Sequence, residues 1–181
     1  MNRPIYKLPA VVIPAAIMIL LSGCTGTGLP FIKREKTVGK DIAIDDITEF
    51  YWTYATSSFP PEYQRYYFSA EDGTYRFYHE TREGERFPLQ EEDITVSGTL
   101  ELTAEEWNTF FDYLNNGTVR SREENTDSGD SGPWTYLYWK NDKGDIQQFS
   151  FESYKKASDF EAFCKELKAK AADPYRSVSP Q

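Results

Sequence analysis

Apolar and polar residues alternate along several segments of the chain, which is the pattern of a strand with one buried face. The alternation is clearest over Ile94–Leu102, and Thr48–Tyr54 is a dense run of residues that favour strands. Two further runs, Tyr63–Ala70 and Thr74–Glu80, flank Asp72-Gly73, the preferred sequence of a two-residue hairpin turn. The sequence therefore predicts a strand, an antiparallel hairpin and another strand in succession.

A two-residue turn fixes which residues of this hairpin face each other, beginning with Glu71 opposite Thr74. One face then carries the mostly apolar pairs Phe68/Phe77, Tyr66/His79 and Ala70/Tyr75. The other face carries the pairs Tyr67/Tyr78, Arg65/Glu80 and Ser69/Arg76. Both apolar pairs and opposite charges are favourable across strands, so the register is self-consistent. We predict that the first face packs on the core and that Tyr67 and Tyr78 point away from it.

Two segments place apolar residues on one side of a helix, at positions i, i+3, i+4 and i+7. Thr103 and Glu106 have the spacing of a capping box at the start of the first helix, which Asn116-Gly117 ends. Ser158 is predicted to begin or cap the second helix. The two apolar faces consist of Trp107, Phe110, Phe111 and Leu114, and of Phe160, Phe163, Cys164 and Leu167.

Between the helices, a stretch rich in Asn, Ser, Gly and acidic residues predicts a polar loop over residues 115–133, and a second hairpin follows it. Its strands are Trp134–Lys140 and Asp145–Phe151, and a four-residue loop places Tyr136 opposite Phe149 and Trp134 opposite Phe151. Each half of the chain is then a hairpin followed by a helix. This order indicates a weak internal duplication, although packing alone can give two amphipathic helices the same spacing.

Together these elements predict an α+β fold, in which an antiparallel sheet built from hairpins carries both helices on one face. We expect four parts along the chain: a signal peptide over residues 1–23, a lipidated N-terminus and flexible tether over 24–41, a single α+β domain over 42–172, and a disordered tail over 173–181.

The first 23 residues have the layout of a secretory signal. Arg3 and Lys7 precede an apolar run, Leu8–Leu21, whose 14 residues fall short of the roughly 20 that cross a bilayer as a helix. The segment Leu21-Ser22-Gly23-Cys24 resembles the lipobox of bacterial lipoproteins, which implies that Cys24 is lipid-modified and becomes the first residue after cleavage. The resemblance covers 24 residues and implies anchoring at the extracytoplasmic face of the cell membrane. An ordinary secretory signal with an incidental cysteine is the alternative.

Composition narrows the possible partners of the domain. The chain has a formal net charge of −9, which becomes −11 when Arg3 and Lys7 leave with the signal peptide. This acidity argues against nucleic acid as a partner, because a phosphate backbone requires a basic surface. With Cys24 acylated, only Cys164 is left and no internal disulfide forms. Stability must then come from the core, which the 16% aromatic content can supply.

Candidate chemistry along the chain is sparse. Gly129-Asp130-Ser131-Gly132-Pro133 resembles the Gly-Asp-Ser-Gly-Gly-Pro segment of trypsin-like serine proteases, but one glycine is missing. The only histidine, His79, is expected in the core beside Tyr66, so neither a catalytic base nor a zinc site is predicted. Cys164 is expected to be a buried, inert thiol. Calcium remains a possibility at the acidic residues Glu123, Glu124, Asp127 and Asp130.

The sequence best supports a non-enzymatic module that binds a protein or glycan of the cell envelope, with no cofactor, catalytic residue or metal predicted. The candidate binding residues are Tyr67, Tyr78, Arg65 and Arg76, because rings flanked by hydrogen-bonding side chains suit a sugar or a protein partner. The alternative is that these tyrosines merely stabilise the sheet, and the residue pattern by itself favours that alternative slightly over binding. An envelope hydrolase using Ser131 or a carboxylate, and a structural accessory subunit of an envelope complex, are the alternatives.

The lipobox can be tested by replacing its cysteine. In Cys24→Ala the thiol that accepts the diacylglyceryl group is gone, so we expect an unlipidated precursor that keeps its first 23 residues. Intact-mass measurement and membrane fractionation detect both changes, and Cys164→Ala is the matched control. An unchanged mass and membrane association in Cys24→Ala would show that the lipobox assignment is wrong.

Overall fold

The computed structural model describes residues 35–122, 132–142 and 146–172, which form eight strands and two α-helices. The strands are β1 (Lys36–Thr37), β2 (Ile47–Thr56), β3 (Glu62–Glu71), β4 (Thr74–Glu83), β5 (Ile94–Leu102), β6 (Thr118–Arg122), β7 (Gly132–Trp139) and β8 (Ile146–Ser150). The helices are α1 (Ala104–Leu114) and α2 (Tyr154–Ala171), and short 3₁₀ turns precede β2 at Ile44–Asp46 and β5 at Glu91–Asp93. Among these elements, no helix is long and apolar enough to cross a membrane.

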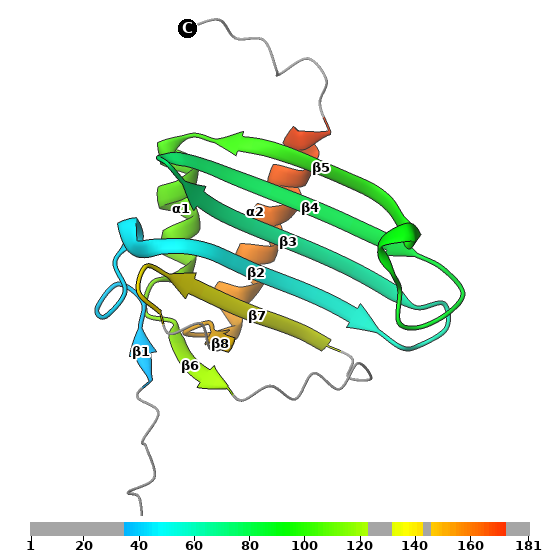
Figure 1. The fold of residues 1–181 in the computed structure, drawn as a ribbon, viewed down its shortest axis with the longest axis horizontal. Coiled ribbons are helices and arrows are strands. Elements are labelled where there is room, and N and C mark those ends of the chain that lie inside the picture. Colours follow the sequence, from blue (N-terminus) through cyan, green and yellow to red (C-terminus); the bar gives the residue numbers. More distant parts are fainter. Residues whose placement is uncertain (1–34, 123–131, 143–145, 173–181) are drawn as a thin grey trace, which may run out of the picture. The chain divides into compact units, whose positions relative to one another are not determined.

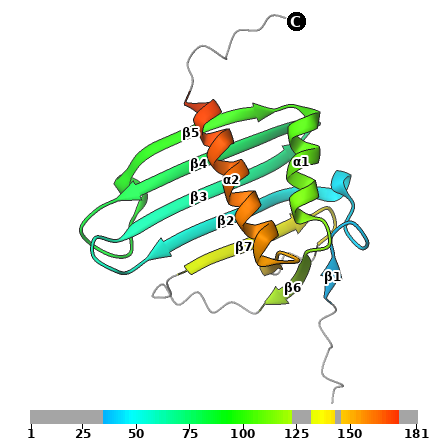
Figure 2. The same cartoon turned by 180° about the vertical axis from the view of Figure 1, so that it is seen from behind.

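All eight strands belong to one antiparallel sheet with the order β1-β6-β8-β7-β2-β3-β4-β5. Both helices lie across the same face of this sheet, behind it in Figure 1 and in front of it in Figure 2. The predicted α+β fold is confirmed. We refer to the face without helices as the open face.

The hairpin of β3 and β4 has the predicted register, from Glu71 opposite Thr74 through Phe68 opposite Phe77. Asp72 and Gly73 have positive φ angles of 50° and 78°, which is the conformation of the turn whose twist matches paired strands. Because the turn sets the register, the faces of the hairpin follow from it. Phe68 and Phe77 are fully buried under the helices, as predicted.

The strand β2 joins the two halves of the sheet. It pairs with β3 on one side, where Phe50 lies opposite Phe68, and with β7 on the other, where Phe50 lies opposite Leu137. All three side chains are fully buried. The long-range β2–β7 pairing therefore places the first and second halves of the chain over one continuous core.

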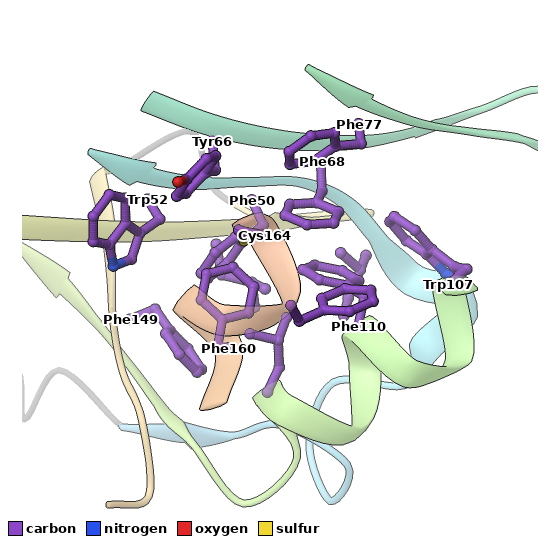
Figure 3. Close-up of a cluster of buried hydrophobic side chains, with 14 of the residues drawn as sticks. Phe50, Trp52, Tyr66, Phe68, Phe77, Trp107, Phe110, Phe149, Phe160 and Cys164 are labelled. Atoms are coloured by element: carbon purple, nitrogen blue, oxygen red, sulfur yellow. The ribbon is translucent and has the colours of Figure 1, made fainter. Parts of the chain in front are cut away.

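Aromatic rings from both layers fill this core, as the high aromatic content predicts (Figure 3). Phe68 on β3 stacks on Phe110 of α1, with ring centroids 4.2 Å apart and planes inclined by 11°. The ring centroids of Phe160 on α2 and Phe50 on β2 lie 5.4 Å apart. The apolar residues predicted for both helices line the sheet-facing side, and only Phe111 among them is half-buried.

The two helix starts differ in how well the sequence predicts them. The capping box of α1 is confirmed: the Glu106 amide donates to Thr103 Oγ1 at 3.1 Å, and the Thr103 amide donates to Glu106 Oε2 at 2.9 Å. The prediction that Ser158 begins α2 is wrong, because Ser153 caps the helix and accepts from the Lys156 amide at 3.2 Å. Ser158 lies inside α2, four residues after the first helical residue, Tyr154.

The second hairpin departs from its predicted register by one residue. Tyr136 of β7 lies opposite Gln148 rather than Phe149. A shift by one residue reverses the faces, so Phe149 is buried under the helices whereas Tyr136 lies on the open face. The loop prediction over 115–133 is also wrong in part, because β6 occupies Thr118–Arg122 and its one apolar residue, Val119, pairs with Phe149.

The folded domain begins before the predicted boundary at residue 42. Lys36 and Thr37 pair with β6, and Val38 is fully buried. The tether predicted over 24–41 is therefore too long at its C-terminal end. The predicted signal peptide (1–23), Cys24 and the predicted tail (173–181) lie outside the described residues.

Each half of the sheet is followed by a helix, as expected for the weak duplication. The strands before the helices are nevertheless arranged differently. β2 to β5 pair in chain order, whereas β6 pairs with β8 rather than with β7.

Truncating Phe77 tests the assignment of the two faces. Phe77 is fully buried against Phe68 and Tyr66, so Phe77→Ala leaves a cavity and should lower the free energy of unfolding by about 3–5 kcal/mol. Tyr154→Ala, which removes an exposed ring of α2, is the matched control and should lower it by about 0.5 kcal/mol or less. Urea denaturation followed by circular dichroism measures both. Equal losses in the two variants would contradict this assignment.

Candidate binding site on the open sheet face

Four tyrosines form a row across the open face. The strand registers place Tyr136, Tyr51, Tyr67 and Tyr78 side by side on β7, β2, β3 and β4, and Thr99 of β5 continues the row. Side chains alternate between the faces of a strand, so this row is the counterpart of the phenylalanines buried under the helices.

The four residues predicted as a binding surface lie in one place. Arg65, Tyr67, Arg76 and Tyr78 all line a depression of about 450 Å³ on the open face. The depression is completed by three residues that sequence analysis did not single out: Tyr51, Ser69 and Thr99. Ser69 was assigned to the correct face, but Tyr51 and Thr99 required knowledge of which strands flank the hairpin.

The rings of the depression are held in place at both ends. Tyr51 and Tyr67 pack against each other with centroids 4.6 Å apart and planes inclined by 32°. The Tyr51 hydroxyl donates to Glu49 Oε2 at 2.7 Å, and the Tyr78 hydroxyl donates to Glu80 Oε2 at 2.7 Å. Because each acceptor lies two residues along the same strand, both hydroxyl groups are fixed over the sheet.

A buried ion pair supports one side of the depression. Glu80 and Arg82 are only 4% and 8% exposed, although both lie on the open face. Glu80 Oε1 accepts from Arg82 Nε at 3.0 Å and from Arg82 Nη2 at 2.6 Å. The third nitrogen, Arg82 Nη1, donates to the Leu89 carbonyl at 3.2 Å, and the guanidinium group lies 4.4 Å from the Tyr63 ring centre. Glu80 and Arg82 are two residues apart in the sequence, so both charged side chains lie on the same face of β4, and this spacing could have indicated the pair.

The protonation states in the depression follow from these contacts. Burial alone would raise the pKa of Glu80, but hydrogen bonds from Tyr78 and Arg82 and the positive charges of Arg82 and Arg65 lower it overall. Burial and the hydrogen bond to Glu80 raise the pKa of Tyr78 to about 12. Burial also raises the pKa of Tyr51 and of Tyr67. At neutral pH these three tyrosines are therefore neutral and Glu80 is ionised.

The two arginines that line the depression have few partners of their own. Arg65 Nη1 lies 3.8 Å from Glu80 Oε1, beyond hydrogen-bond distance, and Arg65 Nε is buried with no hydrogen-bond partner in the described part of the chain. Arg76 Nη1 lies 3.7 Å from Glu71 Oε2, in a pair that is exposed to solvent. The Arg65 guanidinium group also lies 5.4 Å from the Tyr63 ring centre. Because Arg65 Nε is buried, a ligand can reach this arginine only at its terminal nitrogens, whereas the side chain of Arg76 is 47% exposed.

His79 and Cys164 occupy the core, as predicted. His79 is 2% exposed and lies opposite Tyr66, and a Cβ atom at Gly98 would lie 2.9 Å from His79 Nε2, which explains the glycine in β5. Burial and the nearby charge of Lys168 lower the pKa of His79, so it packs as a neutral ring. Cys164 is fully buried, and burial raises the pKa of its thiol.

The remaining candidate chemistry falls largely outside the structure described here. Ser131 and the possible calcium ligands Glu123, Glu124, Asp127 and Asp130 lie in the undescribed segment 123–131. Within residues 35–122, 132–142 and 146–172, no three His, Cys, Asp or Glu side chains gather where they could hold a metal ion.

A second depression, of about 550 Å³, lies on the helix side between β2, β3 and α2. Its lining combines Trp52, Tyr54 and Tyr66 with both acids and lysines, namely Glu62, Glu161, Lys165 and Lys168. Lys168 Nζ donates to Gln64 Oε1 at 3.0 Å and to Thr81 Oγ1 at 2.9 Å. Because this lysine is already hydrogen-bonded within the protein and the charges of the lining balance, the open-face depression is the stronger candidate.

No known protein family, curated protein or solved structure matches the chain. The site is therefore interpreted from its own geometry.

Replacing Glu80 tests the ion pair that supports the depression. Glu80→Gln leaves the buried Arg82 without its counter-charge, so we expect the free energy of unfolding to fall by about 3–5 kcal/mol at neutral pH. The folded-state pKa of Glu80 is lowered, so its stabilising charge is present above the unfolded pKa of about 4.3 and is lost as the pH falls below it. The difference between wild type and Glu80→Gln should therefore shrink in acid.

Urea denaturation at neutral pH and at about pH 3 measures this dependence. Glu62→Gln, which removes an exposed charge of β3, is the matched control. A difference between wild type and Glu80→Gln that stays constant between the two pH values would argue against an ionised Glu80 in the folded protein.

Proposed function

We propose that the protein is a membrane-anchored, extracytoplasmic lipoprotein whose open sheet face binds a protein or glycan of the cell envelope without catalysing a reaction. The proposed address rests on Leu21-Ser22-Gly23-Cys24. The proposed activity rests on one observation: Tyr67, Tyr78, Arg65 and Arg76 line a single depression on the face that the helices leave uncovered.

The composition of the depression favours recognition. Tyrosine and arginine are the residues that contribute most often to the energy of binding surfaces, because they offer a large rigid area and several donors. Here the rings are fixed by Glu49 and Glu80, so little conformational entropy is lost when a ligand contacts them.

The contacts also favour binding over catalysis. Glu80, which contacts two lining residues of the depression, is bound by Arg82 and by the Tyr78 hydroxyl, so both of its oxygens are occupied. Its lowered pKa makes it a poor proton donor at neutral pH. We therefore assign Glu80 a positioning role for Tyr78 and Arg82.

The double substitution Tyr67→Ala/Tyr78→Ala tests this function. Both rings line the depression and neither is part of the buried core, so the change should weaken binding to isolated cell envelopes by about tenfold or more. The measurement is cosedimentation of the purified full-length protein with envelope fragments over a range of concentrations. Tyr154→Ala, which removes an exposed tyrosine from α2, is the matched control.

The folded state of each variant is checked by circular dichroism and by its urea midpoint. The double variant should lose less stability than Phe77→Ala, because its rings are not buried under the helices. If the double variant bound envelopes as tightly as wild type, or if it unfolded the domain, this face would not be the binding site.

A further inference from the structure

We propose that the depression binds an acidic oligosaccharide, whose sugar rings stack on the tyrosines while its carboxylate groups are bound by Arg65 and Arg76. This inference rests on the proposed function and specifies the ligand class of the same site. Its first support is charge: the lining of the depression contains two arginines and no acid, in a chain whose net charge is −9. The carboxylates of Glu49, Glu71 and Glu80 contact lining residues but are not part of the lining, so the charged groups of the lining itself are both positive.

The state of the two arginines gives the second support. Arg82 donates two hydrogen bonds to Glu80 Oε1, whereas Arg65 Nη1 lies 3.8 Å from the same oxygen and the Arg65 side chain is 36% exposed. The terminal nitrogens of such a loosely paired guanidinium group can bind a carboxylate ligand, because their planar arrangement matches the two carboxylate oxygens. Among the described residues, Arg76 Nη1 pairs with Glu71 Oε2 at 3.7 Å, and this pair is exposed to solvent.

The arrangement of the lining gives the third support. Along the open face, Tyr67 and Tyr78 face each other, with Arg65 one step along β3 on one side and Arg76 one step along β4 on the other. Residues two apart on a strand are separated by about 7 Å, so the two arginines flank the tyrosine pair from opposite directions. A chain of sugars with an acidic group on successive units can contact both arginines, whereas a single sugar contacts one.

An acidic peptide fits this surface less well. The strands β3 and β4 pair on both sides, so their backbone donors and acceptors are taken up within the sheet. An extended peptide on this face would therefore leave its own backbone groups unpaired, and peptides usually bind sheets along an edge instead. A sugar has no such backbone, and its hydroxyl groups can bond with Ser69 and Thr99, which also line the depression.

The experiment measures binding of the full-length protein to four probes by isothermal calorimetry. The probes are a hexamer of galacturonic acid, the galacturonate monomer, a neutral glucose hexamer of the maltose series, and a glutamate hexapeptide with the same number of side-chain carboxylates as the galacturonate hexamer. We expect the galacturonate hexamer to bind most tightly and about tenfold or more tighter than the galacturonate monomer. Equal or tighter binding of the glutamate peptide would overturn the assignment to a sugar.

Substitutions then locate the charge contacts. Arg65→Gln and Arg76→Gln should each weaken binding of the galacturonate hexamer by about tenfold, while Arg120→Gln, on β6 and away from the depression, should leave it unchanged. Arg76 is exposed, and the ion pair that it makes with Glu71 in the described part of the chain is long, so Arg76→Gln tests the contact even if Arg65→Gln perturbs the fold. Unchanged affinity in Arg76→Gln would overturn the proposal.

The same variants separate this inference from the proposed function. If Tyr67→Ala/Tyr78→Ala loses envelope binding while both arginine variants retain it, the face is a binding site but its ligand is not anionic. If none of these variants changes envelope binding, the proposed function itself fails.

Discussion

The packing of Phe50 is the interaction on which the rest of the structure depends. Its ring contacts five other phenylalanine rings, at centroid distances of 5.4 to 6.3 Å, and these come from β3, α1, α2, β8 and the residue after β8: Phe68, Phe110, Phe160, Phe149 and Phe151. Figure 3 shows several of these rings gathered between the sheet and the helices. Because Phe50 lies on the strand that pairs with both β3 and β7, it holds together both halves of the chain and both layers of the domain.

The core and the candidate site are two consequences of the same strand geometry. Phe50 points toward the helices, so its neighbour Tyr51 must point to the open face. The same alternation holds for Phe68 with Tyr67 and for Phe77 with Tyr78, and the pairing of the strands places those three tyrosines in a row. The register that packs the phenylalanines in the core therefore also brings the tyrosines together. A change of register by one residue would disrupt the core and separate the tyrosines.

Turns and helix caps, which depend on residues close in sequence, were predictable from the sequence, whereas the pairing of distant strands was not. Asp72-Gly73 fixes its hairpin because a two-residue turn leaves one register, and Thr103 with Glu106 fixes a helix start because the contact is local. The second hairpin was misplaced by one residue, since its longer loop leaves the register to the burial of Leu137 and Phe149. Likewise, Tyr51 joins the site only because β2 neighbours β3, a fact that no local pattern carries. The buried Glu80–Arg82 pair could have been predicted from the sequence, because residues two apart on a strand lie on the same face.

The position of α2 in the chain has a consequence for how the protein folds. α2 is the last described element, yet its Phe160 and Phe163 cover Phe68 of the third strand, at 5.8 and 6.4 Å. In a chain that emerges N-terminus first, Phe110 of α1 can cover Phe68 early, but the cover stays incomplete until α2 has been made. Until then part of the aromatic surface of the sheet is exposed to association with other chains. Late closure of the core also suits a protein that crosses a membrane before folding, as the proposed export would demand.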